Sequence, residues 1–540
     1  MASFLPRFTA SALVLLGIIG GQQAAAQAPA KQWDKRYGGS AYDGLYALHQ
    51  TTDGGYLLAG SSESPISGVK SQAKRGYWVV RTDANGNKLW DKTFGGTSVA
   101  TLCSVRPTAD GGYLLGGTSR AGLEEDKTQP NRGGDDYWVV KIDANGTKLW
   151  DKTFGGTDTD VLQDLQPTAD GGAVLGGYSS SGVTGDKSQP NYGAGSDFWV
   201  IRLDANGNKL WDKTLGTTEP EPQKVALCLT PDGGILLGTS SAAGINGDKT
   251  QSRKGGSDYW LIRLDANGTK LWDRTIGGTG EDYLYALAPT NEGGFILGGH
   301  SSSRAGADKT QPSRGDADYW LVKVDALGQF QWDSSLGGPN SDFLFSVQQT
   351  TDGGYFAAGH SYSGQGGDKS QALRGINDYW VAKLNPEGAK QWEASYGGSD
   401  YDFLSQARQT ADGGYLLGGQ SHSSQGGDVT QATYGAADFW VVKIGGTATA
   451  TTAPKTAGLL HAYPNPAGRQ VRLPLPADAP RAGLRLRLLD AQGRTVATQP
   501  VTATAAAEVP VTLGQPAAGL YLLRLEGPNG YLATQPLLVE

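Results

Sequence analysis

Short segments in which apolar and polar residues alternate recur along residues 31–444. In the third repeat these segments are "VLQDLQPT", "AVLGGYSS", "DFWVIRLD" and "NKLWDKTL", and their period of two is typical of β-strands. Asp170-Gly171-Gly172 lies between the first two segments and Ala205-Asn206-Gly207 between the last two. Such turns need positive φ, which Gly and Asn tolerate, so both pairs are predicted to form hairpins. Each repeat is therefore predicted to contain four antiparallel strands.

Two tryptophan series give the period of the repeat, which is about 60 residues. The members of the first series each begin a Trp-Asp or Trp-Glu pair: Trp33, Trp90, Trp150, Trp211, Trp272, Trp332 and Trp392. The members of the second follow a Tyr or Phe: Trp78, Trp138, Trp199, Trp260, Trp320, Trp380 and Trp440. Together they account for all 14 tryptophans. We expect these large side chains to pack between neighbouring sheets.

The first and last copies of the repeat are incomplete. "KQWDKRY", which begins at Lys31, is a lone fourth strand, and "DFWVVKI", which ends at Ile444, is a lone third strand. Pairing the two would complete a seventh unit and leave no exposed sheet edge. The sequence therefore predicts an all-β protein in which residues 31–444 form a seven-bladed β-propeller of four-stranded blades, closed by pairing of its N- and C-terminal strands.

Composition narrows the class of protein. Of the 540 residues, 38 % are hydrophobic and 18 % are charged, which is a globular balance, and the 81 glycines favour many short strands and tight turns. The formal net charge of -7 is spread along the chain, so nucleic acid is not an expected partner.

The N-terminus has the features of a secretory signal. Arg7 precedes an apolar run from Ala10 to Ile19, and Ala24-Ala25-Ala26 supplies a small-residue cleavage site, so residues 1–26 are predicted to be a signal peptide. The run is too short for a membrane span, and none is expected in the mature chain. Export permits disulfides, but the two cysteines, Cys103 and Cys228, occupy different repeats and are expected to be free buried thiols.

A second domain follows a change of composition. Residues 445–456, rich in Thr, Ala and Pro, are predicted to be a flexible linker, and residues 457–540 carry strands that suit a small Ig-like β-sandwich. This segment contains Tyr463-Pro464-Asn465-Pro466, then "LDAQGR" with Gly493, then Gly519-Leu520-Tyr521 ahead of an apolar end. In this order it resembles the type A sorting domain of the type IX secretion system of Bacteroidetes-like bacteria.

The resemblance implies where the protein is located. It implies that the N-terminal signal directs export across the inner membrane, and that the C-terminal domain engages the type IX machinery for passage through the outer membrane. The protein would then be secreted or held at the cell surface of a Gram-negative bacterium. Residues 31–444 resemble the Gly-rich propeller repeats of bacterial surface and secreted proteins.

Two polar patterns lie in the loops at one end of the predicted blades. One is an Asp four residues after a Gly-Gly pair: Asp43, Asp160, Asp282, Asp342 and Asp402. The other is Asp-Lys-Ser/Thr-Gln, which begins at Asp126, Asp186, Asp248, Asp308 and Asp368. Carboxylates as close as Asp158 with Asp160, or Asp400 with Asp402, suit a calcium ion, although no certain cofactor is expected. The alternatives are direct ligand contact and the capping of loop backbone in every blade.

No catalytic residues are assigned. His300 and His360 stand at matching positions after a second strand and are candidate ligand-binding residues, but no partner acid or nucleophile motif accompanies them. The sequence favours an exported, non-catalytic recognition module that binds a glycan or a protein at the long-loop face. The alternatives are an enzyme acting on extracellular polymers and a structural component of a surface layer.

Overall fold

A computed structural model describes residues 27–445 apart from 99, 220, 222 and 223. In the C-terminal region it describes 460, 462–463, 465, 467, 470–475, 484–490, 495–501, 508–513, 516–526 and 532–539. The predicted signal peptide, nearly all of the predicted linker, Pro464, Pro466 and Gly493 lie outside these residues. The chain divides into a repeat unit and a C-terminal unit. The described residues contain strands and turns but no helix, and therefore none long and apolar enough to cross a membrane.

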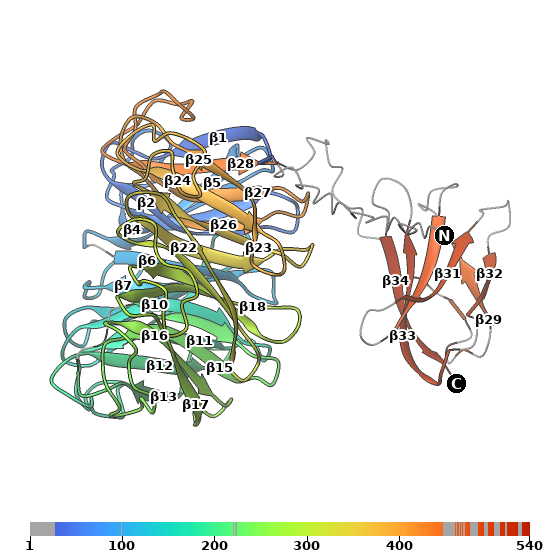
Figure 1. The fold of residues 1–540 in the computed structure, drawn as a ribbon, viewed down its shortest axis with the longest axis horizontal. Helices are drawn as coiled ribbons and strands as arrows, with labels where there is room; N and C mark the ends of the chain where they lie inside the picture. The colour runs from blue at the N-terminus through green and yellow to red at the C-terminus, as the bar shows by residue number, and fades with distance from the viewer. Residues whose placement is uncertain are drawn as a thin grey trace, which may run out of the picture. The chain divides into compact units, whose positions relative to one another are not determined.

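The repeat unit contains seven four-stranded antiparallel sheets, called blades 1 to 7 (Figure 1). Blades 1 to 3 consist of β2 (Asp43–Gln50), β3 (Tyr56–Ser62), β4 (Arg75–Thr82) and β5 (Lys88–Gly96); β6 (Ala100–Pro107), β7 (Tyr113–Ser119), β8 (Asp136–Ile142) and β9 (Lys148–Phe154); and β10 (Asp160–Pro167), β11 (Ala173–Ser179), β12 (Asp197–Leu203) and β13 (Lys209–Leu215). Blades 4 to 6 consist of β14 (Ala226–Leu229), β15 (Ile235–Ser241), β16 (Asp258–Leu264) and β17 (Lys270–Ile276); β18 (Asp282–Pro289), β19 (Phe295–Ser301), β20 (Asp318–Val324) and β21 (Phe330–Leu336); and β22 (Asp342–Gln349), β23 (Tyr355–Ser361), β24 (Asp378–Leu384) and β25 (Lys390–Tyr396).

Blade 7 is assembled from both ends of the repeat unit. Its strands are β26 (Asp402–Gln409), β27 (Tyr415–Ser421), β28 (Asp438–Ile444) and β1 (Lys31–Tyr37). β1 pairs antiparallel with β28, in a register that places Tyr37 opposite Phe439, and the two strands lie side by side in Figure 1. The two lone strands of the sequence therefore supply each other's missing hairpin partner.

The second tryptophan series packs between consecutive blades, as expected. All seven of these side chains are fully buried. Trp138 of blade 2 contacts Tyr77 of blade 1 with ring centroids 4.7 Å apart, and the Tyr77 hydroxyl donates a 2.9 Å hydrogen bond to the Trp138 carbonyl. The same tyrosine bond recurs at Tyr137, Tyr259, Tyr319 and Tyr379. Core packing and a directional bond therefore fix the spacing of neighbouring blades.

The first tryptophan series is half-buried, and six of its members lie against the glycine of the turn between the third and fourth strands of the next blade. Trp90 of blade 1 lies against Gly146 in the turn of blade 2. Gly146 has a φ of 79°, and a Cβ there would approach the Trp90 ring to 2.9 Å. The turn thus needs glycine both for its backbone conformation and for contact with the neighbouring blade.

The C-terminal unit has two sheets around a core of its own. Its strands are β29 (Gln470–Pro474), β30 (Leu484–Leu489), β31 (Thr495–Val501), β32 (Glu508–Thr512), β33 (Gly519–Glu526) and β34 (Leu532–Val539). β29 pairs with β32, and the other sheet has the order β31-β30-β33-β34. The buried core includes Leu473, Leu486, Leu523 and Leu537.

The described residues of the sorting motif hold the last strand. Asn465 Oδ1 accepts a 2.9 Å hydrogen bond from the Leu538 amide, and Tyr463 donates one of 2.6 Å to Glu508. Gly519 begins β33 opposite Val539, and the Tyr521 hydroxyl donates to the Ala517 carbonyl.

Candidate functional site

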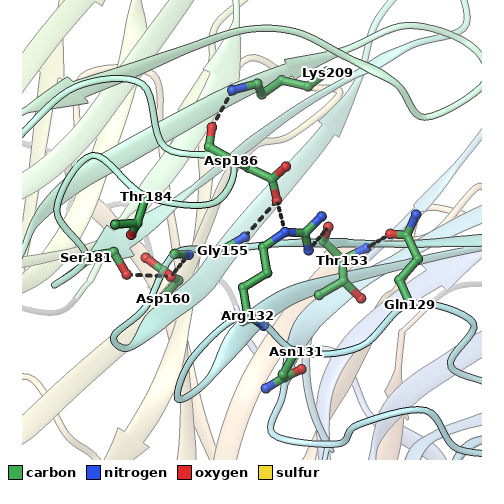
Figure 2. A network of polar contacts seen from close by, with 12 residues as sticks. Gln129, Asn131, Arg132, Thr153, Gly155, Asp160, Ser181, Thr184, Asp186 and Lys209 are labelled. Atoms are coloured by element: carbon green, nitrogen blue, oxygen red, sulfur yellow. Dashed lines mark hydrogen bonds and ion pairs between the residues drawn. The ribbon is translucent and has the colours of Figure 1, made fainter.

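The Asp that follows each Gly-Gly pair joins the loop that enters its blade to the loop after the second strand of that blade. Asp160 begins β10, is fully buried, and accepts hydrogen bonds from the Gly156 amide at 2.7 Å and the Ser181 hydroxyl at 2.9 Å (Figure 2). Asp43, Asp282, Asp342 and Asp402 are equally buried and make the same pair of bonds with Gly39 and Ser64, Gly278 and Ser303, Gly338 and Ser363, and Gly398 and Ser423. These contacts are those of the loop-capping alternative.

The two blades that lack this Asp also lack the Ser. Blade 2 has Ala100 with Ala121 in these places, and blade 4 has Glu221 with Ala243. Glu221 stands four residues after Thr217, so the irregular "EPEPQ" segment keeps a carboxyl at the position of the Asp. Burial raises the pKa of this carboxyl to about 7. The serine is therefore found only in the blades that have the Asp, whose carboxylate accepts the hydrogen bond of the serine hydroxyl.

The Asp-Lys-Ser/Thr-Gln motif connects neighbouring blades. The Asp186 carboxylate accepts a 3.1 Å bond from the Gly155 amide of the preceding blade and lies 2.9 Å from Arg132 Nε (Figure 2). Gln129, the last residue of the preceding copy, accepts a 2.8 Å bond from the Thr153 amide on the outermost strand. The amide of the third motif residue binds the carboxylate of the Trp-Asp pair, as Thr128 does with Asp151 at 2.9 Å. The motif thus caps exposed backbone in successive blades.

Blade 7 departs from this motif and compensates for the departure. Val429 replaces the buried lysine that blade 6 has at Lys369, and Arg36 on β1 replaces the hydroxyl that blade 6 has at Ser395. Arg36 is buried, lies 3.5 Å from Asp438, and donates a 2.9 Å bond to Ser421. In blade 7 the buried cation thus lies on β1 instead of in the loop after the second strand. Its contacts link β1 to the other strands of the blade.

Burial controls the charge of a second set of carboxyls, those that begin the third strands. Asp318 is fully buried, and its Oδ2 accepts a 2.6 Å bond from the Arg314 amide. Burial raises the pKa of this carboxyl to about 6, with a further increase from the nearby Asp342. The pKa values of Asp136, Asp197 and Asp258 rise to about 6 for the same main reason.

The calcium candidates are distributed between surface and interior. Asp158 is exposed, and its backbone amide donates to Ser181, while Asp400 is half-buried, and its amide donates to Ser423. The carboxylates of Asp160 and Asp402 make the internal bonds described above. In the described part of the chain, no group of three His, Cys, Asp or Glu residues is arranged to hold a metal ion. Calcium binding at these positions stays a prediction.

His300 and His360 belong to a cluster of aromatic side chains at the ends of the first and second strands of blades 5 to 7. We call this cluster the aromatic belt, and it consists of Tyr283, Tyr285, His300, Phe343, Phe345, His360, Tyr362, Tyr401, Phe403 and His422. His300 stacks on Tyr285 at 5.2 Å and meets Phe343 of the next blade edge-on at 4.7 Å. His360 repeats the arrangement with Phe345 and Phe403, both at 5.0 Å.

The belt presents rings to the surface and contains neutral histidines. His300 and His360 are buried, whereas Tyr401 is 37 % exposed and Tyr283, Phe343, Tyr362, Phe403 and His422 are half-buried. Burial lowers the pKa of His300 to about 4 and that of His360 to about 3, so both imidazoles are neutral at pH 7. Neutral rings of this kind pack against apolar surface and hydrogen-bond polar groups.

Among the described residues, the ring-to-ring contacts of the belt lie in three consecutive blades. The position of Tyr283, Phe343 and Phe403 is held by Gly44, Thr101 and Val161 in blades 1 to 3. The position of His300 and His360 is held by Ser61, Thr118 and Ser240 in blades 1, 2 and 4, and by Tyr178 in blade 3. Blade 1 has Tyr42 and Tyr46 at the positions of Tyr401 and Tyr285, so single rings also occur outside blades 5 to 7. The two histidines stand out in the sequence of a single unit, whereas the rings around them do not. Aligning the seven units position by position is the signal that could have found those rings.

The two cysteines are free thiols, as expected. Cys228 is buried and Cys103 half-buried, and burial raises the pKa of each thiol to about 12. Both therefore remain protonated at neutral pH.

Comparison with known proteins assigns the C-terminal unit. Residues 461–540 match the family model of the secretion system C-terminal sorting domain. The regulatory protein FlaEY of Caulobacter vibrioides is 27 % identical over 395 residues, which cover 66 % of this chain and 39 % of FlaEY. The chain therefore matches well under half the length of that relative.

Several solved structures are similar to the chain at low identity. A protein of unknown function from Dyadobacter fermentans has 13 % identity and a TM-score of 0.38, covering 77 % of this chain and 99 % of its own. A puromycin hydrolase has 12 % identity and a TM-score of 0.41, covering 82 % of this chain and 61 % of its own. A member of the DUF4221 family from Bacteroides vulgatus has 9 % identity and a TM-score of 0.32, covering 63 % of this chain and 91 % of its own.

The repeated four-stranded sheets and the sorting domain together define the protein. Its C-terminal unit is recognised by the type IX secretion machinery. The chain is a β-propeller repeat protein with a type IX C-terminal sorting domain, and it is secreted by, or attached to the surface of, a Gram-negative bacterium.

Proposed function

We propose that this protein is an exported, non-catalytic recognition module whose ligand is a glycan, bound on the aromatic belt at the long-loop end of blades 5 to 7. The observation that carries the proposal is the clustering of partly exposed rings that contact one another in these blades. Aromatic faces suit sugar rings because they offer flat apolar area, with hydroxyls and imidazoles beside them for hydrogen bonds. A protein ligand would use the same rings as anchors.

The proposal includes the architecture that would display the site. The pairing of β1 with β28 supports a closed ring of seven blades, and two antiparallel sheets around one core support an Ig-like C-terminal sandwich. It also includes cleavage of residues 1–26 as a signal peptide. Carboxylates at the loop ends would act as scaffold, and Ca²⁺ at Asp158 with Asp160, or Asp400 with Asp402, would strengthen loops beside the ligand.

A glycan array probed with the purified full chain, in Ca²⁺ and again in EGTA, tests the proposal. Reproducible binding of a glycan class is expected, and the Tyr401→Ala and Phe403→Ala double variant should lose at least about fivefold in affinity, since stacking is worth roughly 0.5–1.5 kcal/mol per ring pair. The matched control is Thr101→Ala, at the equivalent position of blade 2. The glycan assignment would be refuted if the folded protein bound no glycan on the array. It would also be refuted if the double variant bound with the affinity of the wild type.

A further inference from the structure

A cavity of about 580 Å³ is lined by the first strands of all seven blades. This volume lies within the range of small-molecule sites. The lining residues come from the second half of each first strand, towards the Asp-Gly-Gly turns, whereas the belt residues Tyr283, Phe343 and Phe403 come from the start of those strands. The cavity shares only Tyr285 and Phe345 with the aromatic belt, and the polar groups from which the inference is drawn lie outside the belt, so the inference does not depend on that proposal.

One position of the repeat supplies a row of hydrogen-bond donors to this cavity. It is the second residue before the Thr of the turn, and the side chains there in blades 6, 7, 1, 2 and 3 form what we call the donor arc: Gln348, Arg408, His49, Arg106 and Gln166. In blades 4 and 5 the same position holds Cys228 and Ala288, which are small. Donors thus occupy five consecutive blades, and small side chains leave room in the other two.

Two donors of the arc lack acceptors. Arg408 Nε and Gln348 Nε2 are buried and make no hydrogen bond in the described part of the chain. A buried donor without an acceptor is costly, so such a group calls for a partner, which water or a bound ligand can supply. Burial lowers the pKa of the Arg408 guanidinium to about 10, with a further decrease from Arg106. Even so, Arg408 is charged at neutral pH.

The charges of the lining leave an excess of cations. Asp164 is the one acid among the described lining residues, and it is paired with Arg106 at 3.0 Å. Asp164 also accepts a 3.0 Å bond from the Leu227 amide. Lys224 and Arg408 therefore face the cavity without a carboxylate of their own. Burial, with Arg408 and Arg106 nearby, lowers the pKa of His49 to about 4, so this histidine is neutral at pH 7.

We propose that the cavity is a binding site for a small ligand that carries an oxyanion group, such as a carboxylate, phosphate or sulfate. The planar guanidinium of Arg408 would pair with two oxygens of the group, and Gln348 of the neighbouring blade and Lys224 of blade 4 would supply further donors to the ligand. The apolar rings of Tyr285 and Phe345, which also line the cavity, would cover the rest of a small ligand.

Isothermal titration of the full chain with inorganic phosphate, sulfate and malonate, at constant ionic strength set with chloride, tests the site. At least one probe is expected to bind saturably and to raise Tm. The probe that binds most tightly distinguishes a carboxylate ligand from a phosphate or sulfate ligand. Arg408→Gln should weaken that binding at least tenfold, and Gln348→Leu severalfold. Arg120→Gln, which removes an exposed arginine paired with Asp135, is the matched control and should leave the affinity unchanged.

A stability measurement separates a ligand site from a structural role. Without ligand, Arg408→Gln is expected to have a Tm equal to or above that of the wild type, because it removes a buried charge that has no partner. Absence of saturable binding by all three probes, or an Arg408→Gln variant with wild-type affinity, would overturn the proposal. If Arg408→Gln lowers Tm and Gln348→Leu keeps wild-type affinity, the arc is structural and the proposal also fails.

Discussion

The outer strands and the first strands of the blades follow different rules. In the outer part, the same side chains make the same contacts in nearly every blade: a buried Trp bonds the carboxylate of the Trp-Asp or Trp-Glu pair, as Trp138, Trp199, Trp260 and Trp440 do with Asp151, Asp212, Asp273 and Asp34. On the first strands, equivalent positions differ from blade to blade, as with Phe403 and Thr101. A contact repeated in every blade meets a packing demand that all blades share. Positions that hold different residues in different blades can provide a specific binding site, because their side chains are not required for the shared packing.

The largest expected effect tests the repeated part. Trp260→Ala should lower the free energy of unfolding by about 3–5 kcal/mol, because a fully buried indole leaves a cavity and its Asp273 partner loses a bond. Urea denaturation followed by far-UV circular dichroism measures the loss. Trp138→Ala should cost the same amount within error. A large inequality between the two would show that the blades are not energetically equivalent.

Blade 7 offers a sharper test, because its cation sits on a different strand. Arg36→Thr should cost about 3 kcal/mol by leaving the buried Asp438 without its partner. Adding Val429→Lys rebuilds the lysine–threonine pair that blade 4 has in Lys249 and Thr275, so the double variant should recover most of the loss. A double-mutant cycle measures the coupling. Additive effects of the two substitutions would contradict the exchange of roles.

The buried carboxyls predict a pH dependence with a defined sign. The pKa of Asp318 is about 6 in the folded protein against a usual 3.8, so the folded state holds its proton more tightly. The stability that this group contributes is full below about pH 3.8 and is lost as the pH rises through 6. Asp318→Asn should therefore lose less stability than the wild type between pH 4 and pH 7. Parallel urea-denaturation profiles of the two proteins across this window would contradict the assignment.

The smallest expected effect concerns the first strands. Tyr401→Ala removes a ring that is 37 % exposed, and the free energy of unfolding should change by less than about 0.5 kcal/mol. Thermal and urea denaturation give the measurement. A loss of several kcal/mol would make the belt part of the framework and would remove the contrast with the outer strands.

Much of the fold could be predicted from the sequence. The four segments of the third repeat correspond to β10 to β13, and the lone strands beginning at Lys31 and ending at Ile444 correspond to β1 and β28. Period-two alternation and Gly-containing turns act within a few residues, so local sequence is sufficient to specify them. The sorting motif was also readable, because its residues lie in a fixed order near the end of the chain.

The candidate site was only half predictable. His300 and His360 are recognisable in the sequence, but their edge-on contacts with Phe343 and Phe403 of the next blades join residues 43 positions apart. The carboxylates of Asp160 and Asp402 were considered as ligands for calcium, and their bonds to glycine amides and serine hydroxyls became visible only in three dimensions.

The sequence by itself therefore determined the strands, the turns, the number of units and the export address, because each follows from short-range pattern or motif order. Only the tertiary structure decided which of the repeated polar residues form hydrogen bonds inside the blades. It also decided which of the residues that vary between units contact one another in neighbouring blades. The exchange between Arg36 and Val429 illustrates the reason: the two positions lie at opposite ends of the repeat unit and belong to one blade only after β1 pairs with β28. Packing brings such distant positions together, and no local pattern records it.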